Sequence, residues 1–158
     1  MLAIDHTIKR YPKRHEISMD RDRGIMNVRR MRDADIPDVA RAHARAQRAA
    51  WQAAYTGILF DASWDGLSEL EFERAWQEII RRPNRTNLVV EREGYVVGYI
   101  AFGPPSDQKD DTATGEIYGL YVHPGHWRHG AGGQLLAVAL EHLDERGVTS
   151  VVVWSMRD

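Results

Sequence analysis

The sequence contains no cysteine. This absence excludes disulfides, thiolate ligands for a metal, and any reaction that passes through an acyl-cysteine intermediate. It also fits a reducing compartment, and the N-terminus lacks the apolar core of a signal peptide. We therefore expect a cytoplasmic protein.

Long hydrophobic runs and a strong net charge are also missing. No apolar run approaches the ~20 residues that a membrane-spanning helix needs. The 21 basic and 23 acidic residues leave a formal net charge of −2, so no overall basic field would attract nucleic acid. Neither a membrane nor a nucleic acid is expected as a partner. A chain of 158 residues, 43% of them hydrophobic, suits one globular domain with a core of its own.

Residues 1–25 differ from the rest, because charges and scattered apolar residues alternate there without a steady period. We predict a flexible N-terminal extension, either a mobile tail or a loosely docked arm, before a domain that spans 26–158. Contact of its basic residues with an acidic partner is a weaker alternative to a solvated extension. These residues are Lys9, Arg10, Lys13 and Arg14.

The domain begins with a strand and a long helix. Apolar and polar residues alternate over 27–31, as in a half-buried strand, with Val28 and Met31 expected to point inward. An alanine-rich segment over 33–57 follows, with Asp33 placed to cap a helix.

A second helix and a hairpin come next. Ser68 and Glu71 have the spacing of a capping box, which predicts a helix start. Two apolar runs over 87–103 flank Glu93 and Gly94, which predicts an antiparallel hairpin with a tight turn.

The last unit is a strand over 116–122, a glycine-rich loop, a helix over 133–147 and a strand over 148–156. A strand–helix–strand unit gives a parallel pair with a right-handed crossover. Because the preceding hairpin is antiparallel, we predict a mixed sheet in an α/β fold.

The glycine-rich loop sets Gly130, Gly132 and Gly133 at the start of the last helix. A helix N-terminus exposes unpaired N–H groups and carries about +0.5 of an elementary charge. Without Cβ atoms an anion such as a pyrophosphate can reach these groups, and Arg128 and His129 can add charged hydrogen bonds. The alternative is a turn that only reverses the chain.

Two phosphate-binding loops do not fit this spacing. A nucleoside-triphosphate loop needs Lys followed by Ser or Thr after its last glycine, and Gln134 stands there. A dinucleotide loop places its first glycine directly after the strand, whereas seven residues, His123 to His129, intervene here. Leu135 also occupies the place of its third glycine.

One known signature does fit, because residues 120–136, LYVHPGHWRHGAGGQLL, resemble the acetyl-coenzyme A loop of the GNAT superfamily of N-acetyltransferases. That signature is a strand ending in Val-x-Pro, then Gln or Arg-x-x-Gly-x-Gly or Ala, then a helix that opens with Leu-Leu. The matching positions are Val122, Pro124, Gly130, Gly132, Leu135 and Leu136. Trp127 stands at the Gln or Arg position.

The resemblance implies a GNAT-like fold: a mixed, mostly antiparallel central sheet flanked by helices. The parallel strands 116–122 and 149–156 would splay apart around acetyl-coenzyme A. The first of them would pair with the pantetheine arm, and the glycine loop would hold the pyrophosphate. The implied cofactor-binding residues are Leu120, Tyr121, Val122, Arg128, His129, Gly130, Ala131, Gly132 and Gly133.

The implied reaction is acetyl transfer to a primary amine of a small molecule or protein, by direct attack in a ternary complex. The amine must first lose a proton, so a base is needed, and a backbone N–H near Val122 would stabilise the oxyanion. By resemblance, Glu116 is the candidate catalytic base; the alternative is a solvated carboxylate at the end of a strand.

Three aromatic residues are candidates for the acceptor site. Trp51 and Tyr55 lie four residues apart on one helical face, in a region that borders the acceptor in this superfamily. Tyr118 and Leu120 would share the face of Glu116 by the period of two. Core packing is the alternative for all three aromatic residues.

We expect no metal, because the transfer needs none and His123, His126 and His129 fall in the predicted loop. The superfamily usually continues into a further helix, which often bears the tyrosine that protonates the thiolate, and two more strands. We therefore expect a C-terminally truncated domain, which could be a catalytically impaired coenzyme A-binding or regulatory module. The open sheet edge would favour a homodimer or another partner strand.

Overall fold

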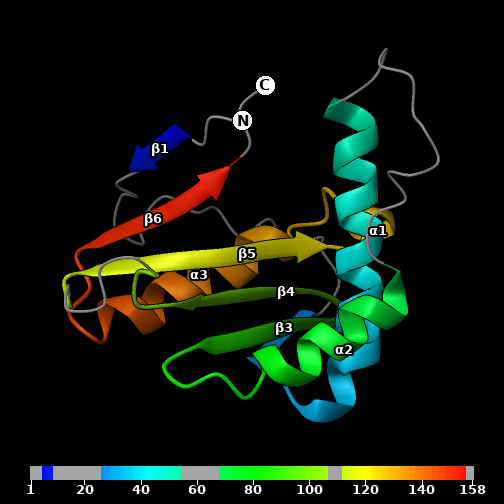
Figure 1. The fold of residues 1–158 in the computed structure, drawn as a ribbon, viewed down its shortest axis with the longest axis horizontal. Helices are drawn as coiled ribbons and strands as arrows, with labels where there is room; N and C mark the ends of the chain where they lie inside the picture. Colours follow the sequence, from blue (N-terminus) through cyan, green and yellow to red (C-terminus); the bar gives the residue numbers. More distant parts are fainter. Residues whose placement is uncertain (1–4, 9–25, 55–67, 107–111, 156–158) are drawn as a thin grey trace.

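The computed structural model describes residues 5–8, 26–54, 68–106 and 112–155. They form a six-stranded sheet in the order β1-β6-β5-β4-β3-β2, drawn in Figure 1. The strands are β1 (Asp5–Ile8), β2 (Met26–Arg30), β3 (Thr86–Arg92), β4 (Tyr95–Gly103), β5 (Thr114–Val122) and β6 (Ser150–Ser155). All neighbouring strands are antiparallel except β5 and β6, which are parallel. The predicted mixed, mostly antiparallel sheet is confirmed.

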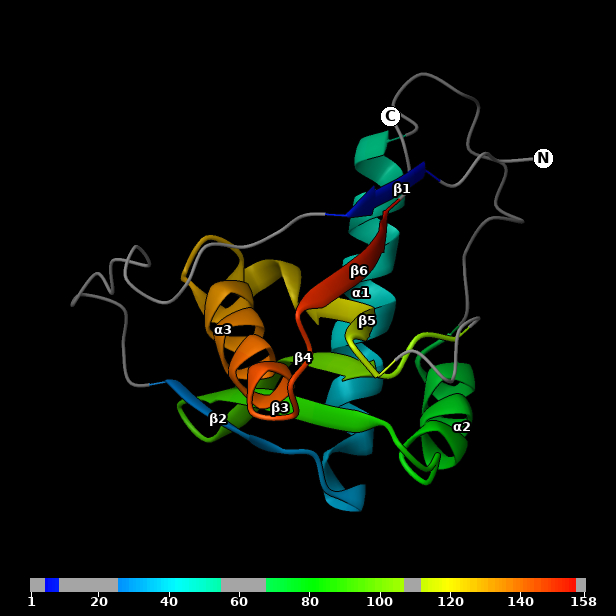
Figure 2. The same cartoon turned by 90° about the vertical axis from the view of Figure 1, so that its left-hand side faces the viewer.

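Helices cover both faces of this sheet, as Figure 2 shows. They are η1 (Asp33–Asp35), α1 (Ile36–Ala54), α2 (Glu69–Ile79), η3 (Pro124–His126) and α3 (Ala131–Asp144). Helices α1 and α2 pack on one face around Trp76 and Tyr99, and α3 packs on the other around Leu135 and Ile100. Among the helices that the structure describes, none is both long and apolar enough to cross a membrane.

The two-layer core explains how β2 is buried. Val28 packs against the core on the α3 side, whereas Met31 belongs to the core on the side of α1 and α2. Residues three apart in an extended chain point to opposite faces of a sheet. Both side chains therefore point inward, as predicted, but into different layers.

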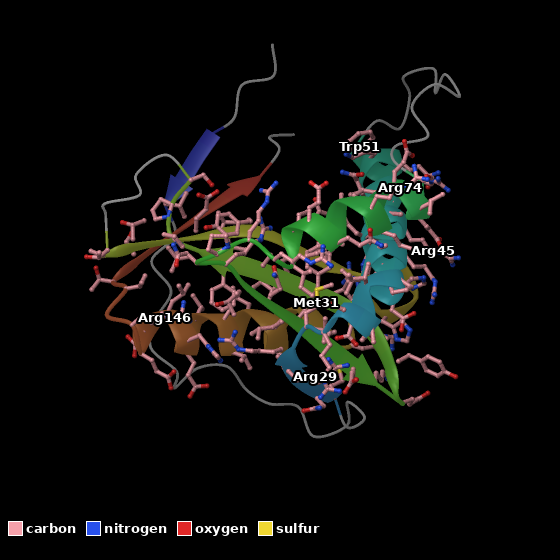
Figure 3. All side chains as sticks on the ribbon, turned by 60° about the horizontal axis from the view of Figure 1, so that its bottom comes forward. Arg29, Met31, Arg45, Trp51, Arg74 and Arg146 are labelled. Carbon is pink, nitrogen blue, oxygen red and sulfur yellow. The ribbon has the colours of Figure 1, made fainter. Side chains whose placement is uncertain are left out.

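The start of α1 is held by an ionic cluster rather than by the predicted cap. The Arg29 guanidinium donates to both oxygens of Asp35, at 2.7 and 2.8 Å, and to Glu91 at 2.5 Å. Asp35 also accepts the Arg32 backbone N–H at 2.7 Å, while Asp33 is exposed. Hydrogen bonding to Arg29 lowers the pKa of the Asp35 carboxyl. The cluster ties β2 and β3 to η1, directly before this helix, close to the labelled Arg29 and Met31 of Figure 3.

Local signals placed α2 and the hairpin correctly. Ser68 donates its backbone N–H to Glu71 at 2.8 Å, and its hydroxyl accepts the Glu71 N–H at 3.2 Å. Glu93 and Gly94 both have positive φ, 54° and 83°, as a two-residue hairpin turn requires. Both predictions are confirmed.

Strand β1 comes from the segment predicted to be a mobile tail or a loosely docked arm. Its four residues pair antiparallel with β6, from Asp5 opposite Ser155 to Ile8 opposite Val152. Asp5–Ile8 therefore forms an arm on the outer edge of the sheet. The division of the chain into an extension and a domain at residue 26 stays a prediction, and the predicted end of the long helix at Gly57 lies outside the described residues.

Candidate active site

The parallel strands β5 and β6 separate halfway along their length. Their pairing runs from Thr114 opposite Ser150 to Ile117 opposite Val153, and β5 then continues to Val122. Figure 1 shows β6 rising away from β5 beyond this point. In the part of the chain that the structure describes, no strand lies against the second half of β5 on this side. The predicted splay is confirmed.

The backbone groups on this open edge can be assigned from the pairing on the other edge. The His123 N–H donates to the Val97 carbonyl of β4 at 2.8 Å. Since backbone groups alternate in direction along a strand, Val122 and Leu120 present their N–H and C=O groups to the open edge. The Val122 carbonyl accepts the indole N–H of Trp127 at 2.6 Å, which agrees with this direction. The Leu120 groups and the Val122 N–H are thus placed to pair with an extended ligand.

A bulge interrupts β5 just before this edge opens. Ala101 of β4 lies opposite Gly119, but the next residue, Phe102, lies opposite Ile117. Tyr118 therefore has no residue opposite it. A bulge of this kind bends the strand and moves the following side chains to the other face.

This bulge corrects one prediction about the site. Tyr118 and Tyr121 pack against the core on the side of α1 and α2. Ile117 belongs to the core on the α3 side, so its neighbour Glu116 faces the side of α1 and α2. Leu120 points to the other face, where its Cδ2 lies 3.7 Å from the position of a Cβ on Gly132. The prediction that Leu120 shares the face of Glu116 and Tyr118 is wrong, because the extra residue reverses the alternation after Tyr118.

Glu116 is buried, with 6% of its surface exposed. Its carboxylate accepts the backbone N–H of Ser106 at 2.6 Å. Tyr118 donates its hydroxyl to the Pro104 carbonyl in the same loop. The alternative of a solvated strand-end carboxylate is wrong, since Glu116 lies inside the fold beside the point where β5 leaves β6.

The loop after β5 turns through two unusual backbone conformations. Arg128 has φ 61° and Gly130 has φ 88°, both in the left-handed region. This region suits glycine and is rare for a residue with a Cβ. The turn brings α3 in at Ala131, two residues before the predicted start at Gly133.

The first turn of α3 leaves three backbone donors without a helical acceptor. The first i to i−4 bond of the helix joins the Gln134 N–H to the Gly130 carbonyl at 3.0 Å. The N–H groups of Ala131, Gly132 and Gly133 precede it, and the capping residue is a glycine with no side chain to accept from them. These donors are available to an anion.

The fold itself gives no reason for two of the three glycines. Gly132 and Gly133 have ordinary helical φ values, in contrast to Gly130. A Cβ on Gly132 would meet only Leu120 and Val122 side chains, at 3.7 and 3.8 Å, and one on Gly133 would meet nothing within 4 Å. Since glycine costs helix stability, a requirement outside the fold explains these two positions better.

A cluster of rings that sequence reasoning did not assign to the site lies on the side of β5 that faces α1 and α2. The His43 ring lies 4.1 Å from that of Phe72 and 4.2 Å from that of Tyr121, and its Nδ1 lies 3.0 Å from the Tyr99 hydroxyl. Tyr99 also meets Trp76 edge-on at 4.6 Å. The available signal was a histidine on the apolar stripe of an alanine-rich helix.

The predicted acceptor residues of α1 lie farther along the same helix. Figure 3 shows Trp51 beyond Arg45, toward the end of α1, and Trp51 is partly buried. Tyr55 lies outside the described residues, so the predicted pair is not placed together. Within the described ranges, no group of three or more His, Asp or Glu side chains could hold a metal ion.

The sequence profile of the Acetyltransferase (GNAT) family matches residues 45–158. The chain belongs to this family. Its relatives include the N-acetyltransferase YuaI of Bacillus subtilis, 30% identical over 130 residues that cover 82% of this chain and 71% of that protein. A probable N-acetyltransferase of Mycobacterium tuberculosis is 32% identical over 117 residues, 73% of this chain and 63% of its own length.

Solved GNAT structures share the fold. The PaiA N-acetyltransferase of Thermoplasma acidophilum, in complex with coenzyme A, superposes with a TM-score of 0.65 at 17% identity, over 85% of this chain and 81% of that one. A GNAT acetyltransferase of Brucella melitensis, in complex with acetyl-CoA, superposes with a TM-score of 0.59 at 22% identity. The match covers 82% of this chain and 75% of that one. At such identities the likeness is one of fold.

His43 of this GNAT chain should make its stability depend on pH. Burial lowers the pKa of His43 from 6.5 to about 4. Below pH 6.5 the His43 imidazole binds a proton in the unfolded chain but stays neutral in the folded protein. The free energy of unfolding therefore falls as the pH drops toward 4. We expect a loss of about 2 kcal/mol between pH 7 and pH 5 from this group. Urea unfolding at both pH values should show a smaller loss for His43→Phe, and an equal loss in both proteins would contradict the prediction.

Proposed function

We propose that this GNAT acetyltransferase transfers the acetyl group of acetyl-CoA to a primary amine of a small molecule or a protein. The amine attacks the thioester directly while both substrates are bound. The observation that carries this proposal is the first turn of α3. There, Gly132 and Gly133 leave backbone N–H donors uncovered, although the fold does not require glycine at either position.

The cofactor would follow the open edge of β5 into the glycine loop. The pantetheine arm would pair with the Leu120 backbone groups and the Val122 N–H as an added strand, with Tyr121 between them directing its own backbone groups to β4. The pyrophosphate would lie on the N–H groups at the start of α3, where the helix dipole favours an anion. The residues of this cradle are Arg128, His129, Gly130, Ala131, Gly132 and Gly133.

Glu116 would act as the base, directly or through a water molecule. It takes the proton from the ammonium of the acceptor, and the neutral nitrogen then attacks the thioester carbonyl. The Val122 N–H, on the open edge, would stabilise the oxyanion. The C–N bond forms, the C–S bond breaks, and the departing thiolate takes up the proton that the new amide nitrogen loses. Tyr118, together with Trp51 and Tyr55, would line the acceptor side.

The location and assembly of the enzyme are part of the proposal. We place it in the cytoplasm, which the absence of cysteine supports. Strand β1 pairs with the edge of β6 that was expected to be open, and the sheet then ends in β1 and β2, whose outer edges have no partner strand among the described residues. These two edges support a homodimer as the assembly to look for.

Two measurements test the activity. Acetyl-CoA should raise the melting temperature, because a ligand that binds only the folded state stabilises it. Thiol release in the presence of a panel of primary amines should exceed the rate without amine. A thermal shift with no amine-dependent release would leave only a coenzyme A-binding module, and the absence of any shift would reject both functions.

A further inference from the structure

Arg85 lies on the acceptor side of the sheet and has no role in the reaction described so far. It immediately precedes β3, and its guanidinium carbon lies 4.4 Å from the centre of the Tyr118 ring. Its Nε donates to the Asn87 side-chain oxygen at 3.3 Å. The side chain is partly buried, in a layer that also contains Glu116.

The charge of Arg85 is not neutralised by a contact. Across the described residues, no carboxylate forms an ion pair with Arg85, whereas Arg29 contacts both Asp35 and Glu91. Burial lowers the pKa of Arg85, and this effect outweighs the opposing influence of the Glu116 carboxylate. A guanidinium held in this way is costly to the fold, and such groups concentrate at binding sites.

The contacts of Arg85 leave its binding face available. The Asn87 bond uses Nε, and the guanidinium carbon lies over the Tyr118 ring. The Asn87 bond does not use the two terminal nitrogens, which form the fork that matches a carboxylate or a phosphate. The Glu116 carboxylate lies two residues before Tyr118 on the same face. Its negative charge suits the ammonium group of an acceptor whose acidic group is held by Arg85.

We propose that Arg85 binds an acidic group of the acceptor, so that the preferred acceptor is an amine that also carries a carboxylate or a phosphate. The inference rests on the proposed function, with the amine of the acceptor at Glu116. An amine without the acidic group leaves the guanidinium unpaired in the complex. Sites built around such a partner discriminate strongly against ligands that lack it.

The experiment compares matched acceptors by amine-dependent thiol release. One series holds ω-amino acids of two to six carbons and their primary amides, and the other pairs phosphoethanolamine with ethanolamine. We expect the acidic member of at least one pair to have a kcat/KM at least 10-fold higher in the wild type. The series with the larger ratio tells whether a carboxylate or a phosphate is bound.

Variants assign the preference to the residue. Arg85→Gln should abolish the ratio, and Arg85→Lys, which keeps the charge but not the fork, should retain part of it. Arg82→Gln removes an exposed charge nearby and should leave the ratio unchanged. The KM for acetyl-CoA and the thermal shift by acetyl-CoA should be the same in all four proteins, which reports an intact fold and cofactor site.

Two results would overturn the inference. One is an equal kcat/KM for the acidic and neutral members of every pair in the wild type. The other is a preference that survives in Arg85→Gln, which would leave Arg85 as a residue that only packs on Tyr118. Either result can occur with a normal thermal shift by acetyl-CoA and normal thiol release, so failure of this inference is distinguishable from failure of the proposed function.

Discussion

Gly132→Ala is expected to weaken the binding of acetyl-CoA by roughly 10- to 100-fold and to leave the protein at least as stable. A Cβ at this position lies in ordinary contact, 3.7 Å from Leu120 Cδ2, so the fold accepts it. Alanine in place of a helical glycine adds about 0.5–1 kcal/mol of stability. The same methyl group stands where the pyrophosphate would approach, and a hydrogen bond to a charged group contributes about 1.5–3 kcal/mol.

The measurement is isothermal titration calorimetry with acetyl-CoA, beside thermal unfolding without ligand. Gly98→Ala is the matched control, because its Cβ would lie 2.8 Å from the Tyr121 carbonyl oxygen. This variant should lose stability, since a backbone atom cannot give way easily. Unchanged affinity in Gly132→Ala would refute the assignment of this helix turn to the pyrophosphate.

Glu116→Gln is expected to lower kcat by about 100-fold with little change in the affinity for acetyl-CoA. Loss of a general base costs roughly 10²- to 10⁴-fold, and part of this cost can be carried by water. Glutamine has nearly the same shape and keeps an oxygen for the Ser106 N–H, so the buried site should still fold. Steady-state thiol release with saturating acceptor gives kcat.

A rise in pH provides a second readout of the same role. At higher pH a larger share of the amine is already neutral, so the difference between Glu116→Gln and the wild type should shrink. Glu78→Gln, at an exposed position of α2, is the control and should match the wild type at every pH. A wild-type kcat in Glu116→Gln would leave the carboxylate with a structural role alone.

Local structure that depends on residues close together in the chain could be predicted from the sequence. The capping box of Ser68 and Glu71 and the turn at Glu93 and Gly94 depend on contacts within a few residues, and both have the expected geometry. The same holds for the order of strands and helices from β2 onward and for the glycine loop that identified the family. Hydrophobic period and turn chemistry are local properties, so one chain is enough to read them.

The departures arose where pairing across the sheet decides the outcome. The period of two placed Leu120 beside Glu116, but the bulge at Tyr118 turned Leu120 to the opposite face. Asp33 was the expected cap, yet Asp35 is the carboxylate that meets Arg29 of β2. Neither outcome follows from periodicity, because the bulge depends on the register of β5 against β4, and the ion pair depends on how β2 leads into η1.

By itself the sequence determined the family, the order of elements from β2 onward and the place where an anion would meet bare backbone. The tertiary structure alone decided which groups come together at the candidate site. It buried Glu116, placed the tilted His43 ring 4.2 Å from the Tyr121 ring, and placed Arg85 over Tyr118 with no ion pair to a carboxylate of the described residues. The physical reason is that burial and charge pairing depend on distances between residues far apart in the chain, which only the folded sheet sets.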